Sequence, residues 1–435
     1  MKQIVAMSIP ANSVDLTRAF RRGFAATFAL DLVTKVLGAV TVVVLIRDLS
    51  VSSYAYTTLF LTFAQLAGSA ASSGVRTRYL REEAERISRA TGEGSGGAFF
   101  NALLRATLLI IAVGICLAPV AGAIGFGSSD GGGPKLIFFA TAFAIGFSAA
   151  ELAIAHFQAN RRFFTAGMLS IIRALGLLGA SLAVTVGSGS SLAISLPFIT
   201  VMLLVGTLTA GPIARRSILS YGGLPRLTWF NREEMWLSFY YVAAAGFAYV
   251  DVMVAGALLS EHQVATLGAT LRYLAIALGA IPALGAVLRV RTSQVDIVDS
   301  PAEQEAMVLG WIRRAALPAG FVMGLGVLLA PVVIPQIDGG RYPGSIEAFQ
   351  IFLVTAFSAY LAAPAASVLM AQRRYVTLAS IFSVGLFLNF VGDVAVAQQF
   401  GVIGIAIVSS AVFVAIDAVV VLSSVRYALR PKSRA

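Results

Sequence analysis

Residues 24–46 read FAATFALDLVTKVLGAVTVVVLI, a run that is long and apolar enough to cross a membrane as one helix. A transmembrane helix needs about 20 apolar residues, because the hydrocarbon core of a bilayer is roughly 30 Å thick. The run still contains two charged side chains, Asp31 and Lys35. Lys35 lies about 16 Å along the helix from Phe24, near the midplane of the membrane. A charge at this depth is costly unless it faces a cavity or a partner, so the run indicates both a membrane protein and a functional position.

The composition of the whole chain agrees with this first run. Of its 435 residues, 58% are hydrophobic and 12% are charged, whereas soluble domains carry about 25% charged residues. So much apolar surface needs lipid as its solvent, and we expect an all-α integral membrane protein. Twelve transmembrane helices are predicted, at 24–46, 53–73, 98–126, 136–157, 164–187, 190–213, 236–258, 264–288, 312–335, 347–370, 375–397 and 401–424.

Basic residues fall on alternate sides of these spans. Of the 32 Lys and Arg residues, 25 lie at the two ends of the chain and in every second gap between spans. By the positive-inside rule, both termini are predicted to be cytosolic. This topology and the anionic lipid headgroups explain the net charge of +11 better than nucleic acid does. The outer gaps hold only Arg47, Lys135 and Arg341, and four basic residues remain within spans: Lys35, Arg105, Arg173 and Arg272.

No motif indicates an enzyme or a cofactor. The longest segment outside the predicted spans, around residues 74–97, is too short for a folded catalytic domain. The chain has no Walker A sequence, nucleophile elbow or cluster of metal ligands. His156 and His262 lie too far apart to form a metal-ligand pair by spacing, and the single Cys116 excludes an intramolecular disulfide. We therefore expect a transporter with no cofactor.

A weak internal repeat divides the chain into two halves. Residues 49–55 read LSVSSYA and residues 259–265 read LSEHQVA, and the first, second and last positions match. The offset joins span one to span seven, so the two halves have the same orientation. Parallel repeats of this kind are typical of transporters. We predict an N-terminal lobe of spans one to six at residues 1–221, and a C-terminal lobe of spans seven to twelve at residues 222–435.

Three stretches carry a resemblance to a known family. RDLSVSSYAYTTLF at 47–60 resembles the Arg-x-Leu-Gly-x-x-x-Tyr-Gly pattern of Wzx-type polysaccharide flippases, members of the multidrug/oligosaccharidyl-lipid/polysaccharide exporter superfamily. YVDVMVAGALLSEHQVATLGATLRYL at 249–274 resembles their span-seven pattern, with an Asp inside the span. FGVIGIAIVSS at 400–410 resembles the opening of their span twelve. The chain departs from the pattern at Ser50 and Ala55, where the family usually has Gly.

The resemblance implies a fold and a function. The fold is two six-helix lobes around a central cavity that opens alternately to each side of the membrane. The function is the movement of undecaprenyl-diphosphate-linked oligosaccharide to the outer leaflet of the bacterial cytoplasmic (inner) membrane, for O-antigen, capsule or exopolysaccharide biosynthesis. The implied partners are this lipid-linked oligosaccharide, membrane lipids, and polysaccharide polymerase and chain-length machinery, with no nucleic acid.

A diphosphate is anionic and needs fixed cations along its path through the membrane. The basic residues within spans are therefore the candidates for binding it. Lys35, Arg173 and Arg272 are the predicted substrate-binding residues. Asp31, which shares a helical face with Lys35, and Asp251 in span seven are predicted to couple transport to an ion. A structural role is the alternative for each of them. Asp31 and Lys35 would then neutralise one another, Arg173 would join two helices, and Asp251 would pair with Arg272.

Other charged residues within spans support weaker predictions. Glu151, Asp393 and Asp417 are further candidates for binding a proton or sodium, because a desolvated carboxylate holds a proton more tightly. Arg105 lies near the cytosolic end of its span, and we expect its long side chain to reach the interface.

Two other functions fit parts of the sequence. A cation-coupled multidrug or metabolite antiporter of the same superfamily would bind protons or sodium at Asp31, but its cavity should prefer cations, and the basic residues within spans argue against it. A membrane-embedded polysaccharide polymerase or glycosyltransferase typically displays a large outer loop with a catalytic Arg or His. The outer gaps of this chain are short.

Overall fold

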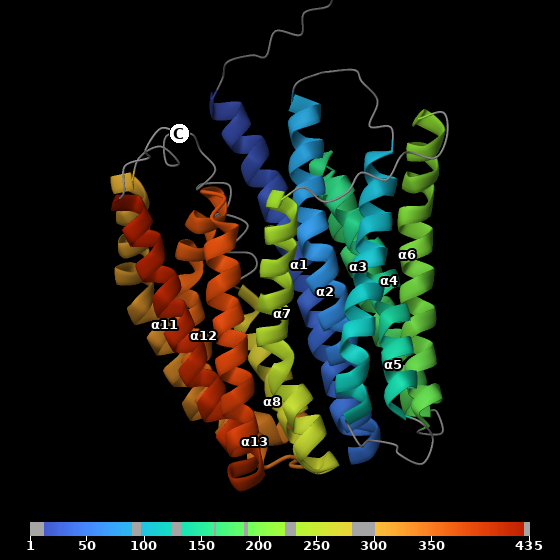
Figure 1. The fold of residues 1–435 in the computed structure, drawn as a ribbon, viewed down its shortest axis with the longest axis vertical. Coiled ribbons are helices and arrows are strands. Elements are labelled where there is room, and N and C mark those ends of the chain that lie inside the picture. The colour runs from blue at the N-terminus through green and yellow to red at the C-terminus, as the bar shows by residue number, and fades with distance from the viewer. Residues whose placement is uncertain are drawn as a thin grey trace, which may run out of the picture.

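The computed structural model describes residues 13–88, 97–123, 132–160, 162–186, 190–221, 232–280 and 301–429. Within these ranges the chain is helical, without β-strands (Figure 1). A short 3₁₀ helix, η2 (Leu278–Ala280), follows α8. The α-helices are α1 (Ser13–Asp48), α2 (Val51–Ser88), α3 (Ala98–Ala123), α4 (Gly132–Ala159), α5 (Phe163–Val186), α6 (Ser191–Tyr221), α7 (Arg232–Leu258), α8 (Glu261–Ala277), α11 (Pro301–Asp338), α12 (Gly344–Ala371) and α13 (Tyr375–Leu429).

The last helix contains a sharp reversal. Gly401 in α13 has φ 58° and ψ −141°, a conformation outside the helical region. Glycine adopts positive φ without the steric cost that a Cβ imposes, so this residue can end one arm of α13 and begin the next. Predicted spans eleven and twelve are therefore the two arms of α13, and they meet at Gly401.

The helices have the length and composition of membrane spans. Within the described ranges, nine helices are long and apolar enough to cross a membrane, with α13 counted once. Of the remaining two α-helices, α2 is more polar and α8 is shorter. Helix α8 covers only the first part of predicted span eight, because residues 281–300 lie outside the described ranges. The protein is a multi-pass membrane protein, while the count of twelve spans and the cytosolic position of both termini stay predictions.

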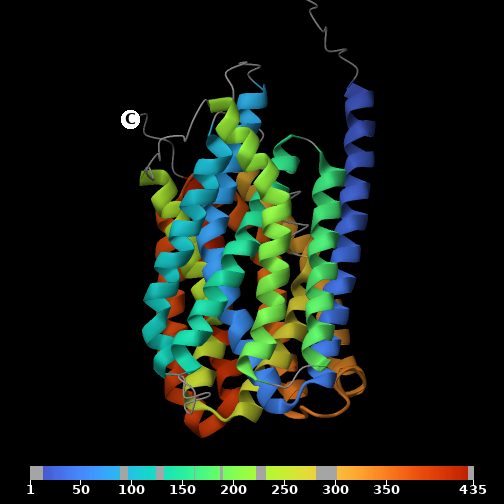
Figure 2. The same cartoon turned by 90° about the vertical axis from the view of Figure 1, so that its right-hand side faces the viewer.

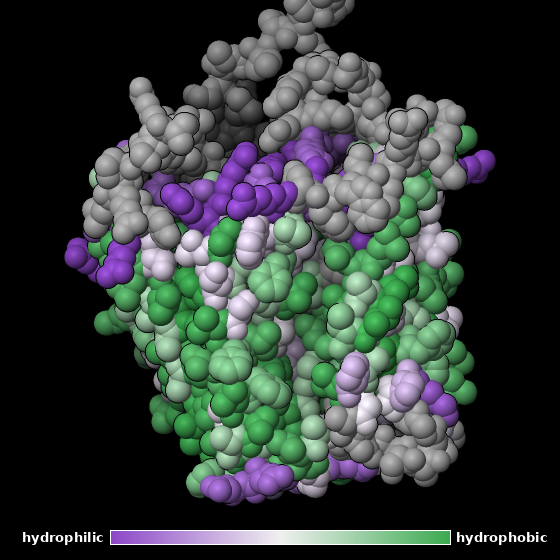
Figure 3. All heavy atoms as spheres, in the orientation of Figure 1, coloured by the Kyte–Doolittle hydropathy of each residue, from purple (hydrophilic) through white to green (hydrophobic). Residues whose placement is uncertain are grey.

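Apolar side chains cover the flanks of the bundle. Figure 3 shows hydrophobic residues over its sides and hydrophilic residues towards its two ends. Large apolar side chains such as Leu317 and Leu328 on α11 are exposed, as expected for residues in contact with lipid. Others, including Phe60, Phe63 and Phe198, are fully buried and pack the interior. The exposed apolar side chains on the flanks thus suit contact with lipid, and the buried ones pack the helices against one another.

Small residues allow the helices to approach closely. At the crossing of α4 and α6, a Cβ atom on Gly146 would lie 2.5 Å from the carbonyl oxygen of Met202. A Cβ atom on Gly206 would likewise lie 2.5 Å from the carbonyl oxygen of Gly146. Since the obstructing atoms are backbone, no side chain can move aside, and the contact requires glycine on both helices.

The helices form two groups. Helices α1–α6 pack mainly on one another, and α7–α13 do the same, while α2 joins the groups by packing on α7 and α8 (Figures 1 and 2). We keep the terms N-terminal lobe and C-terminal lobe for these groups. Lys35 of α1 and Arg272 of α8 lie at the interface between the two lobes.

Ion pairs join the lobes at the end of the bundle that is predicted to be cytosolic. Glu234 at the start of α7 is buried and accepts hydrogen bonds from Arg78 of α2 and from Arg105 of α3, the latter at 2.9 Å. The expectation that Arg105 reaches the interface is wrong, since its side chain is only 9% exposed and pairs with Glu234 inside the bundle. This pairing was hidden in the sequence because residues 105 and 234 belong to different lobes.

At the opposite end, which is predicted to be the outer one, each lobe contributes one arginine that binds the other lobe. Arg47 ends α1 and donates hydrogen bonds to the carbonyl oxygens of Gln336 and Ile337 near the end of α11, the latter at 2.9 Å. Arg341 follows α11 and donates to the carbonyl oxygens of Ile46 at 3.0 Å and Arg47 at 2.7 Å. The last carbonyls of a helix lack intrahelical partners and carry partial negative charge, so each arginine stabilises the helix end of the other lobe. We call Arg47 and Arg341 the outer clasp.

The α4–α6 crossing gives a prediction about stability. Gly146→Ala is expected to lower the free energy of unfolding by about 1–3 kcal/mol, because the added methyl group must push two backbones apart. Thermal unfolding in detergent will measure the loss. Gly211→Ala in α6 is the matched control, since a Cβ atom there meets nothing within 4 Å. Equal stability of the two variants would contradict this account of the crossing.

The outer clasp gives a prediction about access from outside. Arg47→Ala together with Arg341→Ala removes contacts worth about 0.3–1 kcal/mol each, so the lobes should separate more often at their outer end. In a Cys116→Ser background, a cysteine replacing the buried Leu61 should then react about three- to thirty-fold faster with a membrane-impermeant thiol reagent added outside. Lys135→Ala, which removes the remaining basic residue of the outer side, is the control. Labelling of the double variant at the rate of this control would refute the gating role.

Candidate functional site

The predicted pair on α1 is present. Lys35 Nζ lies 2.9 Å from Asp31 Oδ2, and both side chains are partly exposed. Lys35 also donates a hydrogen bond to the carbonyl oxygen of Gly279 in η2. The ammonium group therefore links α1 of the N-terminal lobe to the segment that follows α8 of the C-terminal lobe. Asp31 neutralises Lys35, which agrees with the structural alternative but leaves the pair at the lobe interface.

Arg173 belongs to a triad within the N-terminal lobe. Its guanidinium donates a hydrogen bond to Glu151 of α4 and lies 4.9 Å from the centre of the Phe147 ring. Glu151 accepts a second hydrogen bond from Arg76 of α2. The side chain of Glu151 is only 12% exposed, so one largely buried carboxylate holds two guanidinium groups. We call Arg76, Glu151 and Arg173 the N-lobe triad, and it keeps one positive charge in excess.

Arg76 was not recognised from the sequence as part of this site. The predicted second span ends at residue 73, which places Arg76 among the cytosolic residues. The helix instead continues to Ser88, and Arg76 turns back to Glu151. The end of an apolar run does not show where its helix ends, because polar residues can continue the helix. The partner of Arg76, Glu151 in α4, is also 75 residues away in the chain. Only the packing of α2 on α4 brings the two together.

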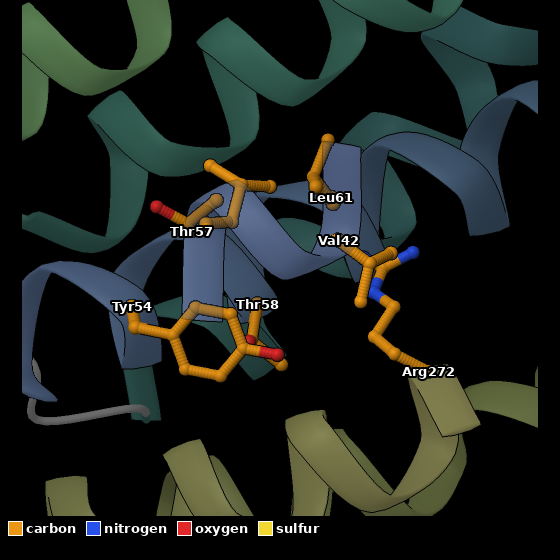
Figure 4. Close-up of a pocket in the computed structure, with 7 residues that line it drawn as sticks. Val42, Tyr54, Thr57, Thr58, Leu61 and Arg272 are labelled. Atoms are coloured by element: carbon orange, nitrogen blue, oxygen red, sulfur yellow. The ribbon is translucent and has the colours of Figure 1, made fainter. Parts of the chain in front are cut away.

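Arg272 of α8 differs from the other two cations. In the part of the chain that the structure describes, it forms no ion pair with a carboxylate. It lines a cavity of about 10 Å³ at the lobe interface, shown in Figure 4. The other lining residues come from α1 and α2: Val42, Leu45, Tyr54, Thr57, Thr58 and Leu61. Arg272 thus extends from the C-terminal lobe to a surface made by the N-terminal lobe.

The alternative pairing of Asp251 with Arg272 is wrong. Asp251 of α7 is buried and accepts a hydrogen bond of 2.6 Å from Asn389 Nδ2 in the first arm of α13. Asp393, one turn further along that arm, lies beside Asp251 and is fully buried. Asp251 and Arg272 lie on either side of the α7–α8 hairpin, which suggested that they pair. In the structure α7 packs on α13, and Asp251 points towards that helix.

Oxygen atoms from three helical segments meet around these two carboxyl groups. Ser409 of the second arm of α13 is buried against them. By distance and angle, neither oxygen of Asp393 nor Oδ1 of Asn389 completes a hydrogen bond within the described ranges. Two adjacent carboxylates repel one another when both are ionised, and a shared proton or a bound cation removes the repulsion. We call Asp251, Asn389, Asp393 and Ser409 the carboxylate cluster.

The three predicted cations do not form one cluster. Arg173 is held inside the N-terminal lobe, whereas Lys35 and Arg272 lie at the lobe interface. Gly279, which accepts the hydrogen bond from Lys35, follows Arg272 by about two helical turns, or roughly 10 Å. Asp417, the remaining predicted acid, accepts a hydrogen bond of 2.6 Å from Ser358 inside the C-terminal lobe. The site therefore consists of two cations at the interface, the N-lobe triad on one side and the carboxylate cluster on the other.

Comparisons of the sequence identify no relatives. No family model matches the chain, and no curated protein matches it.

Solved structures of low sequence identity share its fold. The lipid II flippase MurJ in an inward closed conformation superposes with a TM-score of 0.67 at 15% identity, over 93% of this chain and 87% of that one. An inward-facing multidrug resistance MATE family transporter of the MOP superfamily gives 0.60 at 17% identity, over 95% and 100%. A MOP superfamily transporter from Pyrococcus furiosus, described as having a binding pocket of reverse polarity, gives 0.64 at 14% identity, over 94% and 95%. The chain therefore shares the fold of these solved structures.

Proposed function

We propose that the protein is a flippase for lipid-linked oligosaccharide. It moves polyprenyl-diphosphate-linked oligosaccharide across the bacterial cytoplasmic membrane by alternating access, and it supplies O-antigen, capsule or exopolysaccharide biosynthesis. The observation that carries this proposal is Arg272, a cation at the lobe interface that has no carboxylate partner within the described ranges.

An arginine without a carboxylate partner inside a membrane protein needs another source of stabilisation. A charged group at the centre of a bilayer costs at least about 3 kcal/mol, unless a cavity or a counter-charge stabilises it. The guanidinium group presents parallel N–H donors that fit two oxygens of a phosphate. A diphosphate headgroup passing between the lobes supplies these oxygens. The fold that this chain shares with a lipid II flippase supports a lipid-linked substrate.

The other two cations add positive charge near the same path. Lys35 is paired with Asp31, and a diphosphate would compete with that carboxylate for the ammonium group. The N-lobe triad keeps its excess positive charge because Glu151 is shared by Arg76 and Arg173. Lys35 and Arg173 are therefore proposed as secondary contacts that draw the headgroup between the lobes, and Arg272 as the primary contact.

The lobe interface is held at both ends. The Arg78–Glu234–Arg105 pairs join the lobes at the end proposed to be cytosolic, and the outer clasp joins them at the other end. Alternating access requires that one set of contacts opens while the other stays closed. Both sets consist of hydrogen bonds with charged donors. At the outer clasp, Arg47 is exposed and water can replace the lost partners when the lobes part, whereas Arg105 and Glu234 are buried and water must first enter between them.

The carboxylate cluster is proposed as the coupling site. Asp251 and Asp393 lie inside the C-terminal lobe, and the oxygen atoms around them suit a proton or a hard cation such as sodium. Binding there would neutralise their mutual repulsion and change the packing of α7 on α13. Since α7 also packs on α2, the change would reach the lobe interface. Asp31, the other predicted coupling residue, is proposed instead to hold Lys35.

A second candidate function is a cation-coupled multidrug or metabolite antiporter. The carboxylate cluster favours it, and so does the fold shared with a multidrug resistance MATE family transporter. A cationic drug would have to pass Arg272 and Lys35, which repel it. No observation favours a membrane-embedded polymerase or glycosyltransferase.

Substitution of Arg272 tests the proposed function. Arg272→Ala is expected to lower transport of undecaprenyl-diphosphate-linked oligosaccharide in proteoliposomes at least tenfold, because a charge-assisted hydrogen bond is worth about 1.5–3 kcal/mol. Arg272→Lys should keep part of the activity, since it retains the charge but loses the two parallel donors. Arrival of the oligosaccharide in the far leaflet is measured with a membrane-impermeant enzyme, and Lys135→Ala is the control.

Two results would overturn this assignment. In the first, Arg272→Ala would transport the lipid-linked oligosaccharide as fast as Lys135→Ala does. In the second, the wild-type protein would move no lipid-linked oligosaccharide but would expel a cationic dye against a sodium or proton gradient, and the antiporter would then be the better description.

Substitution in the carboxylate cluster tests the coupling site. Asp251→Asn and Asp393→Asn each remove an ionisable group and preserve side-chain shape, so transport should lose its acceleration by a sodium or proton gradient while transport without a gradient remains. The gradient-dependent ratio of rates measures the effect. Glu261→Gln changes an exposed acid at the start of α8 and serves as the control. An unchanged ratio in both Asp variants would exclude the cluster from coupling.

A further inference from the structure

Two buried hydroxyl groups on α2 lack the hydrogen bonds that such groups usually make. Tyr54 is 2% exposed and Thr58 is 3% exposed. Tyr54 Oη and Thr58 Oγ1 lie close to one another, but by distance and angle neither completes a hydrogen bond within the described ranges. The two residues are one helical turn apart, and both line the cavity that Arg272 enters from the C-terminal lobe (Figure 4).

The neighbouring threonine, Thr57, shows how a hydroxyl group within a helix ordinarily finds a hydrogen-bond partner. Thr57 lines the same cavity, and its Oγ1 donates a hydrogen bond of 2.7 Å to the carbonyl oxygen of Ser53, one turn earlier. Thr58 does not make the equivalent bond. Burial of a hydroxyl without a partner is unfavourable, and the great majority of buried polar side chains have one. Two such groups beside a guanidinium therefore need an explanation.

Helix α8 buries both hydroxyls by packing very closely on α2. A Cβ atom on Gly268 of α8 would lie 2.5 Å from Thr58 Oγ1. At about 10 Å³ the cavity between the two helices is the size of one water molecule and too small for a phosphate. A larger group can enter only when α2 and α8 separate, and that separation uncovers Tyr54, Thr58 and Arg272 together.

We propose that Tyr54 and Thr58 are substrate-contact residues that hold the diphosphate of the lipid-linked substrate together with Arg272. This proposal rests on the proposed function and extends its site to α2. Arg272 supplies the positive charge, and the two hydroxyls supply neutral donors to the remaining phosphate oxygens. The two lobes thus contribute to one anion site, and the phosphate oxygens give the two hydroxyl groups charged acceptors.

The position of the site indicates when it is used. Thr58 lies about 10 Å along α2 from its outer end at Val51, so the site is in the outer half of the bundle. Substrate reaches it after passing Lys35, which lies closer to the midplane. Binding there holds α2 and α8 apart next to the outer clasp. The site is therefore a late contact on the path to the outer leaflet.

A purely structural role makes the opposite prediction, which allows a clear test. If the hydroxyls serve packing, their removal should lower the stability of the substrate-free protein and leave substrate binding unchanged. If they serve the substrate, Tyr54→Phe and Thr58→Val remove unsatisfied polar groups, so the substrate-free Tm should equal or exceed that of the wild type. Thr57→Val is the matched control, because it removes a hydroxyl that is already bonded within the helix.

The experiment compares wild-type, Tyr54→Phe, Thr58→Val, Thr57→Val and Arg272→Ala proteins in detergent. Thermal unfolding is recorded without ligand and in a titration with undecaprenyl diphosphate. We expect Tyr54→Phe and Thr58→Val to weaken binding of undecaprenyl diphosphate about tenfold each, since a hydrogen bond to a charged group is lost. Thr57→Val should bind like the wild type.

The outcomes separate the inference from the proposed function. The inference is overturned if the wild type binds undecaprenyl diphosphate, Arg272→Ala does not, and Tyr54→Phe and Thr58→Val bind as tightly as Thr57→Val. It is also overturned if both hydroxyl variants lower the substrate-free Tm and bind normally. If the wild type binds no undecaprenyl diphosphate, the proposed function fails and the inference fails with it.

Discussion

The high free energy of a charge in hydrocarbon governs the arrangement of this protein. A charged side chain in a span needs a counter-charge, a hydrogen-bond acceptor or water, and each intramembrane cation meets the requirement differently. Lys35 has Asp31 and a backbone carbonyl, and Arg173 shares Glu151 with Arg76. Arg272 has no carboxylate partner within the described ranges and faces a wall of the other lobe that includes the hydroxyl-bearing Tyr54, Thr57 and Thr58. Lys35 and Arg272 are therefore the cations proposed to meet a ligand that passes between the lobes.

The sequence predicted those features that depend on neighbours in the chain. Apolar runs gave the helical membrane fold, and spacing on one helix gave the Asp31–Lys35 pair, which is confirmed. Features that depend on packing between helices were missed or wrong. Arg76 was assigned to the cytosolic side because the end of an apolar run does not mark the end of its helix. Asp251 was predicted to pair with Arg272 as the structural alternative, but it accepts a hydrogen bond from Asn389 of α13.

The two lobes divide the proposed tasks between them. The C-terminal lobe contains the carboxylate cluster, and the N-terminal lobe contains the triad with excess positive charge. Helix α2 connects these parts, because it carries Arg76 of the triad, packs on α7, and presents Tyr54 and Thr58 to α8. It is also among the more polar of the described helices, which explains why it is not among the nine that qualify as membrane spans by composition. Its polarity reflects its central position, away from lipid.

The outer clasp has a consequence for the environment in which the protein works. Its arginines bind main-chain carbonyl oxygens. The contacts at the opposite end depend on a side-chain carboxylate, that of Glu234. In the predicted orientation, the medium outside the cell therefore meets a closure without a carboxylate, whereas the closure that depends on a carboxylate faces the cytosol. Residues 336 and 337 contribute to the clasp through their carbonyl oxygens, which every residue type provides, whereas Ile46 is also fixed by its fully buried side chain.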